Sequence, residues 1–186
     1  TDNAAEAEKQ KRRAEANLDK ALEAVDQLLT RVAEDTLLNE PHMEPLRKKL
    51  LNDAAVFCQS LVEMQGDDPD VRQRAALAER QLGRIRQITG DLEGARMAFQ
   101  ASLDKYAQLA KDDPRNVAMK KARAETLLHF GEVLWGQLLH IEAEQSLRDS
   151  IGLAGELEKS EVAFDLATRV GMNARNALSR QLSWLG

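Results

Sequence analysis

Apolar residues recur at intervals of three and four positions along almost the whole chain. In the first stretch they are Ala14, Leu18, Ala21, Leu22, Val25, Leu28, Leu29 and Val32. This spacing places them on one face of an α-helix. Only 4% of the residues are aromatic, and the 186 residues include 10 glycines and 4 prolines, so few positions favour strands or tight turns. The pattern therefore predicts an all-α fold.

Prolines and glycines divide this pattern into about seven helices. Helix ends are expected before Pro41 and at residues 66–69, 90–91 and 111–114, since proline and glycine end helices there. Residues 1–13 form a charged lead-in, and residues 14–186 form a single helical domain. This domain contains a long N-terminal helix, hairpins at about 43–65, 70–111 and 116–157, and a terminal helix at 160–185. Such short connections make successive helices antiparallel.

The second half of the chain contains an internal repeat. Five features recur 48 positions later: Leu82-Gly83, Gly90, Ala95, Phe99 and Ser102 match Phe130-Gly131, Leu138, Ala143, Leu147 and Ser150. A glycine after a large residue lets one helix of a hairpin approach the other closely, and a small alanine after the turn receives it. The repeat predicts two hairpins built on one plan.

The first copy, from Leu82-Gly83 through Ala95 to Phe99, resembles a tetratricopeptide repeat. The second copy resembles the same signature, with Leu138 in place of a turn glycine. The usual repeat is about 34 residues long, so a spacing of 48 implies longer helices. The resemblance implies a right-handed α-solenoid of antiparallel hairpins, in which the first helix of each hairpin lines a concave groove for a peptide or protein.

The same resemblance selects the residues that line this groove. The last helix is matched at Val170-Gly171, and the whole set is Leu77, Arg80, Gln81, Arg84, Gln87, Glu125, His129, Glu132, Trp135, Arg169, Met172 and Arg175. Its arginines make the groove basic in a protein of net charge −5, which favours an acidic peptide. Solvated helix faces are the alternative for these residues, and packing between repeats is the alternative for Trp135.

A longer stretch, over about residues 8–99, resembles the helical region of large planctomycete serine/threonine protein kinases. The strings that carry this resemblance are RAEANL at 13–18, ALEAVD at 21–26, LTRV at 29–32 and MEPLR at 43–47. It implies that the chain is the regulatory or sensor part of a larger bacterial signalling protein that is anchored in a membrane. It supplies no catalytic residue.

The sequence contains no motif for catalysis. It lacks a glycine-rich phosphate loop and the His-Arg-Asp and Asp-Phe-Gly motifs of kinases. The histidines His42, His129 and His140 have no set of further ligands at metal-binding spacing. Cys58 lies in an apolar run, where it is expected to be a small buried hydrophobic residue. We therefore expect no enzymatic activity, no cofactor and no metal.

The expected partner is a protein or peptide. A net charge of −5 does not favour nucleic acid, and no run of about 18 apolar residues predicts membrane insertion. The start at Thr1 suggests a piece of a longer protein, and the compartment is not indicated. The alternative function is structural: a homodimer formed through the long N-terminal helix or through exposed repeat ends.

Overall fold

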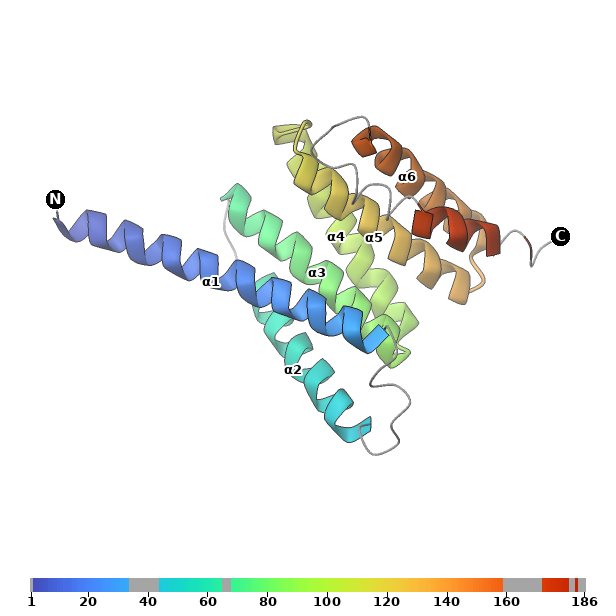
Figure 1. Cartoon of the computed structure of the whole chain (residues 1–186), viewed down its shortest axis with the longest axis horizontal. Coiled ribbons are helices and arrows are strands. Elements are labelled where there is room, and N and C mark those ends of the chain that lie inside the picture. The colour runs from blue at the N-terminus through green and yellow to red at the C-terminus, as the bar shows by residue number, and fades with distance from the viewer. Residues whose placement is uncertain (1, 34–43, 65–67, 159–171, 181–182, 184–186) are drawn as a thin grey trace. The chain divides into compact units, whose positions relative to one another are not determined.

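The computed structural model describes residues 2–33, 44–64, 68–158, 172–180 and 183. All regular secondary structure in these ranges is helical, which confirms the predicted all-α class. The labelled helices are α1 (Asp2–Ala33), α2 (Glu44–Val62), α3 (Pro69–Thr89), α4 (Leu92–Asp112), α5 (Val117–Gly136) and α6 (His140–Glu158), shown in Figure 1. Residues 172–180 are also helical. The contacts divide the chain into two units, Thr1–Cys58 and Gln59–Gly186, and the single domain over 14–186 stays a prediction.

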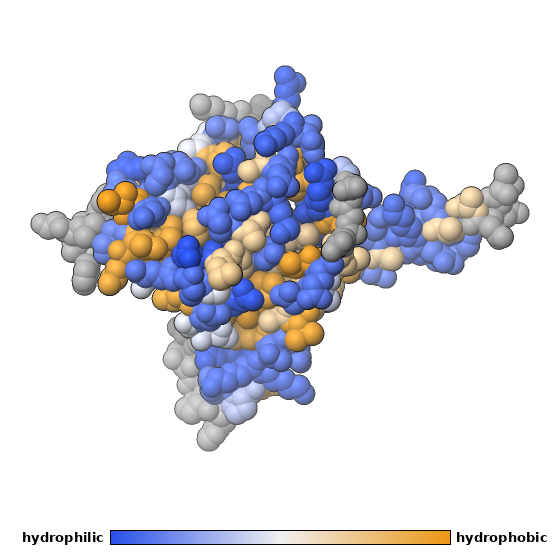
Figure 2. Space-filling model, turned by 180° about the vertical axis from the view of Figure 1, so that it is seen from behind, coloured by the Kyte–Doolittle hydropathy of each residue, from blue (hydrophilic) through white to orange (hydrophobic). Residues whose placement is uncertain are grey.

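Helix α1 includes the charged segment that we expected to precede it. Residues 4–14 are all exposed, and Figure 2 shows this half of the helix as a largely hydrophilic arm. The buried apolar side chains Leu22, Val25, Leu29 and Val32 all lie in the second half. Ala14, Leu18 and Ala21 continue this apolar face toward the N-terminus, and the coiled-coil dimer stays a prediction.

Helix α2 buries Leu51, Ala54, Cys58 and Leu61 at the expected spacing. Burial raises the pKa of the Cys58 thiol to about 12, so the thiol remains protonated at neutral pH. Cys58 is therefore a buried, unreactive side chain, in agreement with its place in an apolar run.

The second unit contains two hairpins of one design. Helix α3 packs against α4, α5 packs against α6, and α4 packs against α5 (Figure 1). In each hairpin a serine of the second helix donates a hydrogen bond to a carbonyl of the first helix. Ser102 Oγ lies 2.8 Å from the carbonyl oxygen of Ala76, and Ser150 Oγ lies 2.7 Å from that of Ala124. Because both members of each pair are offset by 48 residues, the sequence repeat is also a structural repeat.

Two glycines set the distance between the helices of each hairpin. A Cβ atom on Gly83 would lie 2.7 Å from the ring of Phe99, and one on Gly131 would lie 2.8 Å from Cγ of Leu147. Real Cβ atoms do not approach other atoms so closely. Phe99 and Leu147 are both fully buried, so each large side chain occupies the space that the glycine leaves.

The two turns share a backbone geometry but not a residue type. Gly90 has φ of 87° and Leu138 has φ of 64°, the left-handed region that glycine adopts freely. Both turns close with the same hydrogen bond, from Asp91 N to the Arg86 carbonyl at 2.9 Å and from Leu139 N to the Leu134 carbonyl at 3.0 Å. The second hairpin therefore holds a leucine in a strained conformation.

We expect Leu138→Gly to stabilise the protein. Glycine relieves the left-handed strain of a side chain that is 71% exposed, and we expect the free energy of unfolding to rise by about 1 kcal/mol. Urea denaturation followed by circular dichroism measures this change. The matched control is Gly90→Ala, which introduces the same strain into the first turn and is expected to lower stability by a similar amount. A shift in the same direction for both variants would contradict the assignment of strain.

Candidate functional site

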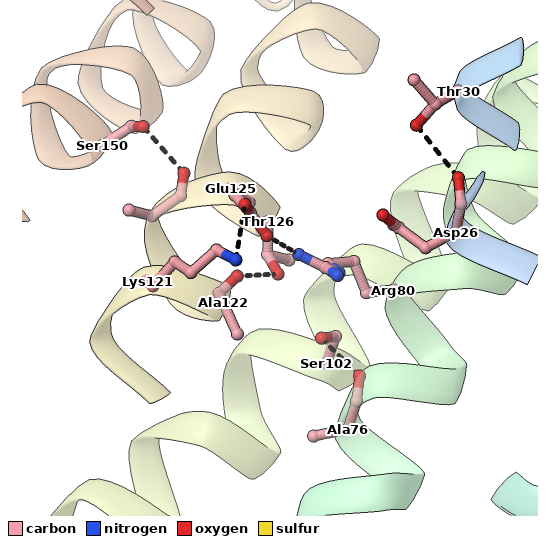
Figure 3. A network of polar contacts seen from close by, with 11 residues as sticks. Asp26, Thr30, Ala76, Arg80, Ser102, Lys121, Ala122, Glu125, Thr126 and Ser150 are labelled. Carbon is pink, nitrogen blue, oxygen red and sulfur yellow. Dashed lines mark hydrogen bonds and ion pairs between the residues drawn. The ribbon is translucent and has the colours of Figure 1, made fainter. Parts of the chain in front are cut away.

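Arg80 and Glu125 join the two hairpins through a buried ion pair. The Arg80 guanidinium on α3 contacts the Glu125 carboxylate on α5, and Lys121 Nζ lies 3.7 Å from the other Glu125 oxygen (Figure 3). The side chains of Arg80 and Glu125 are only 9% and 22% exposed. Glu125 therefore neutralises the charge of Arg80 inside the protein, and this arginine does not supply the open positive charge that we expected for an acidic peptide.

Glu132 is the centre of a second polar cluster between the hairpins. Gln87 Nε2 on α3 and His129 Nδ1 on α5 lie 3.4 and 3.2 Å from its Oε2. The His129 ring also stacks on the ring of the buried residue Phe99, with the ring centroids 6.1 Å apart. Gln87, His129 and Glu132, all selected as groove residues, are thus brought together.

The pKa of Glu132 is lowered by its surroundings. Burial acts to raise this pKa, but it is outweighed by the hydrogen bond and charge of His129, the hydrogen bond of Gln87 and the charge of Arg180. Glu132 consequently carries a negative charge at neutral pH, in contact with groups that stabilise it.

This lowered pKa predicts a pH dependence of stability. A carboxyl group with a lowered pKa in the folded state stabilises the fold above its unfolded-state pKa of about 4.3. That contribution is lost as the pH falls through the lower, folded-state value. We therefore expect the free energy of unfolding of Glu132→Gln to change less with pH than that of wild type below about pH 5. Urea denaturation of both proteins at neutral and acidic pH tests this, and equal acid sensitivity would contradict it.

An open pocket of about 490 Å³ lies beside Glu132. Its lining residues are Leu128, His129 and Glu132 of α5 and Asn173, Asn176, Ser179 and Arg180 of the helical segment 172–180. This segment is held in place because Ala174 and Ala177 pack in a buried cluster with Leu128 and Leu147. The pocket therefore has two helical walls, and Leu128 is the apolar residue of its lining.

In the second wall, the helical segment 172–180, the residues that face the pocket are not the ones that we predicted. Arg169, together with the match at Val170-Gly171, lies outside the described residues. Met172 and Arg175 are exposed and do not line the pocket. The lining residues Asn173, Asn176 and Arg180 instead lie 48 positions after Glu125, Leu128 and Glu132. Extending the 48-residue offset, with Leu178-Ser179 in place of Val170-Gly171, would have selected them from the sequence.

The remaining predicted residues lie apart from the pocket. Gln81 is 0% exposed, so it cannot contact a ligand at the surface. Trp135 lies near the end of α5 with its ring against His140, at a centroid distance of 4.2 Å, which fits packing at the turn between α5 and α6. Leu77 and Arg84 are half-buried on α3. The predicted set is thus divided between a pocket wall, a buried network and a turn.

Within the described ranges, no group of three His, Cys, Asp or Glu side chains is placed to hold a metal ion. None of the helices described has both the length and the apolar character needed to cross a membrane. The pocket beside Glu132 contains the predicted residues His129 and Glu132, and this makes it the candidate functional site.

Comparison of the chain with models of known protein families, with curated proteins and with solved structures found no match. We therefore infer its function from the geometry of this pocket together with the sequence patterns described above.

Proposed function

We propose that this chain is a non-catalytic interaction module that binds a peptide or protein segment in the pocket between α5 and residues 172–180. The observation that supports this proposal is the row of exposed polar side chains Asn173, Asn176 and Ser179 on one wall. An asparagine amide both donates and accepts hydrogen bonds, so it can pair with the N–H and C=O groups of a peptide main chain. The polar wall and the apolar contact at Leu128 together suit a segment with mainly polar and some apolar side chains.

The pocket favours a segment without a large net charge. Glu132 and Arg180 contribute one charge of each sign to its lining, and Glu125 neutralises Arg80 outside it. Binding of an acidic peptide remains a proposal, which rests on the positive charges of Arg84, Arg175 and Arg180. The negative charge of Glu132 would repel such a peptide. The structure of the pocket thus shifts our preference from an acidic partner to a polar one.

We further propose that the hairpins form a right-handed α-solenoid of the tetratricopeptide type. The recurring serine bond, the close approach at Gly83 and Gly131 and the recurring turn geometry support a repeated unit. The packing of α4 on α5 joins one unit to the next, as neighbouring repeats do in a solenoid. On sequence resemblance alone, we propose that the module is the regulatory part of a larger bacterial signalling protein of the serine/threonine kinase type.

Selection of ligands from a random peptide library displayed on phage tests the binding proposal. Enriched peptides are synthesised with a fluorophore, and their affinity is measured by fluorescence anisotropy. We expect Asn176→Ala/Arg180→Ala to weaken binding at least tenfold, the loss of about 1.4 kcal/mol. Gln145→Ala/Arg148→Ala is the matched control, since it removes one amide and one guanidinium from the exposed face of α6, and it is expected to bind as wild type does.

Two results would contradict the proposal. One is the absence of any enriched peptide, and the other is equal loss of affinity in the pocket variant and the control. Light scattering over a wide range of protein concentration then distinguishes the structural alternative, because a mass that rises with concentration indicates self-assembly.

A further inference from the structure

The turn between α5 and α6 exposes three large apolar side chains. Leu138, Leu139 and Ile141 are 71%, 37% and 84% exposed, and we name these three residues the turn patch. A cluster of apolar residues at a turn is unusual because apolar surface in water is unfavourable. In addition, Leu138 adopts a left-handed backbone conformation that glycine would adopt without strain.

The first hairpin has polar or small residues at the equivalent positions, and each has a structural role. Gly90 adopts the left-handed conformation, and Asp91 accepts a hydrogen bond from the Gly94 amide at 2.9 Å. Glu93 accepts hydrogen bonds from Arg96 and Gln137. The second turn keeps the backbone geometry but replaces all three residues with apolar ones, and Ile141, at the position of Glu93, is the most exposed of them.

An interface already present in the protein indicates where that contact lies. The first turn meets the end of the next hairpin's first helix: Gln137 Nε2 lies 3.0 Å from Glu93 Oε2. At the same place, a Cβ atom on Gly136 would lie 3.3 Å from Leu92. Each turn in the repeat is therefore expected to meet the helix end that lies 44 residues further along the chain.

The 48-residue offset transfers these contacts to the second turn. The pair Glu93 and Gln137 becomes Ile141 and Leu185, and the pair Leu92 and Gly136 becomes His140 and Trp184. The polar pair is thus replaced by an apolar pair at both of its members, and two apolar side chains can pack together where two polar ones form a hydrogen bond.

Packing in the described part of the last helix supports the same offset. Phe130 packs against the cluster of Phe99, and Leu178, 48 residues later, packs against the cluster of Leu147. The segment 172–180 therefore follows the same 48-residue offset as the two hairpins.

We propose that the turn patch is the docking surface for the chain's own C-terminal residues Trp184 and Leu185. This contact extends the α4–α5 type of interface by one repeat and removes Ile141 from water. It also fixes the last helix, which carries Asn173, Asn176 and Arg180. The C-terminal residues thereby position one wall of the candidate binding pocket, although their docking does not depend on what the pocket binds.

Fluorescence of Trp184 tests this proposal. The chain has two tryptophans, so Trp135→Phe leaves Trp184 as the single reporter. We expect acrylamide to quench Trp184 severalfold less in the folded protein than in urea. Adding Ile141→Glu to this protein is expected to raise quenching toward the unfolded value while helical circular dichroism is retained, since Ile141 is 84% exposed in the described fold.

A compensating pair provides the sharper measurement. Ile141→Glu/Leu185→Gln recreates the chemistry of Glu93 and Gln137, and we expect it to recover shielding of Trp184 and the melting temperature relative to either single variant. Three results would overturn the proposal: Trp184 quenched equally in the folded and unfolded chain, single effects that simply add in the double variant, or shielding that disappears on dilution as the mass in light scattering falls. The last result would assign the turn patch to a second copy of the chain.

Discussion

Glu125→Leu is expected to lower the free energy of unfolding by about 3–5 kcal/mol, because it removes a carboxylate that neutralises the buried Arg80 charge. The Arg80 side chain is 9% exposed, so water cannot replace the lost partner. Removing both charges is a smaller perturbation, since an apolar pair of similar volume needs no compensation. We therefore expect Arg80→Met/Glu125→Leu to recover most of the loss.

Urea denaturation of the single and double variants measures this difference. Glu156→Leu is the matched control: Glu156 pairs with Lys120 at 3.1 Å, but its side chain is 56% exposed, and an exposed pair contributes only about 0–1 kcal/mol. A double variant less stable than Glu125→Leu, or a control as damaging as Glu125→Leu, would show that burial does not govern the contribution of this ion pair.

Phe99→Ala is expected to destabilise the protein by about 3–5 kcal/mol, the usual range for a fully buried phenylalanine. Phe99 is 0% exposed and packs with Ala95 and Val133, so it connects α4 with α5. The cavity cannot close easily because Gly83, which faces the ring, has no side chain to fill it. The His129 ring loses its stacking partner at the same time, so peptide affinity is expected to fall as well.

Met97→Ala is the control for this prediction. Met97 lies on the same helix but is 62% exposed, and its truncation is expected to change stability by less than about 0.5 kcal/mol. Thermal and urea unfolding, followed by circular dichroism, compare the two variants. Equal stability of Phe99→Ala and Met97→Ala would contradict the assignment of Phe99 as a stabilising contact between the hairpins.

The helices and their ends could be predicted because they depend on local chemistry. The three-and-four spacing of apolar residues, with Pro69 in the first turn of α3 and Asp68 and Asp91 as caps, specifies where helices begin. The 48-residue repeat was also visible in the sequence, since close packing at Gly83 and Gly131 allows only glycine at those positions. Gln87, His129 and Glu132 were among the groove residues that the resemblance to a tetratricopeptide repeat selected.

Only the tertiary structure decided what each polar side chain on that face contacts. Periodicity identifies the face of a helix but not the neighbouring helix that covers it, and Arg80 and Gln81 are buried because α5 and the other helices of the unit pack around α3. The same limit applies to the last helix, where the sequence was matched only at Val170-Gly171, outside the described residues. In the structure Leu178 packs against the cluster of Leu147, as Phe130 packs against that of Phe99, and only this packing reveals the 48-residue offset in the last helix.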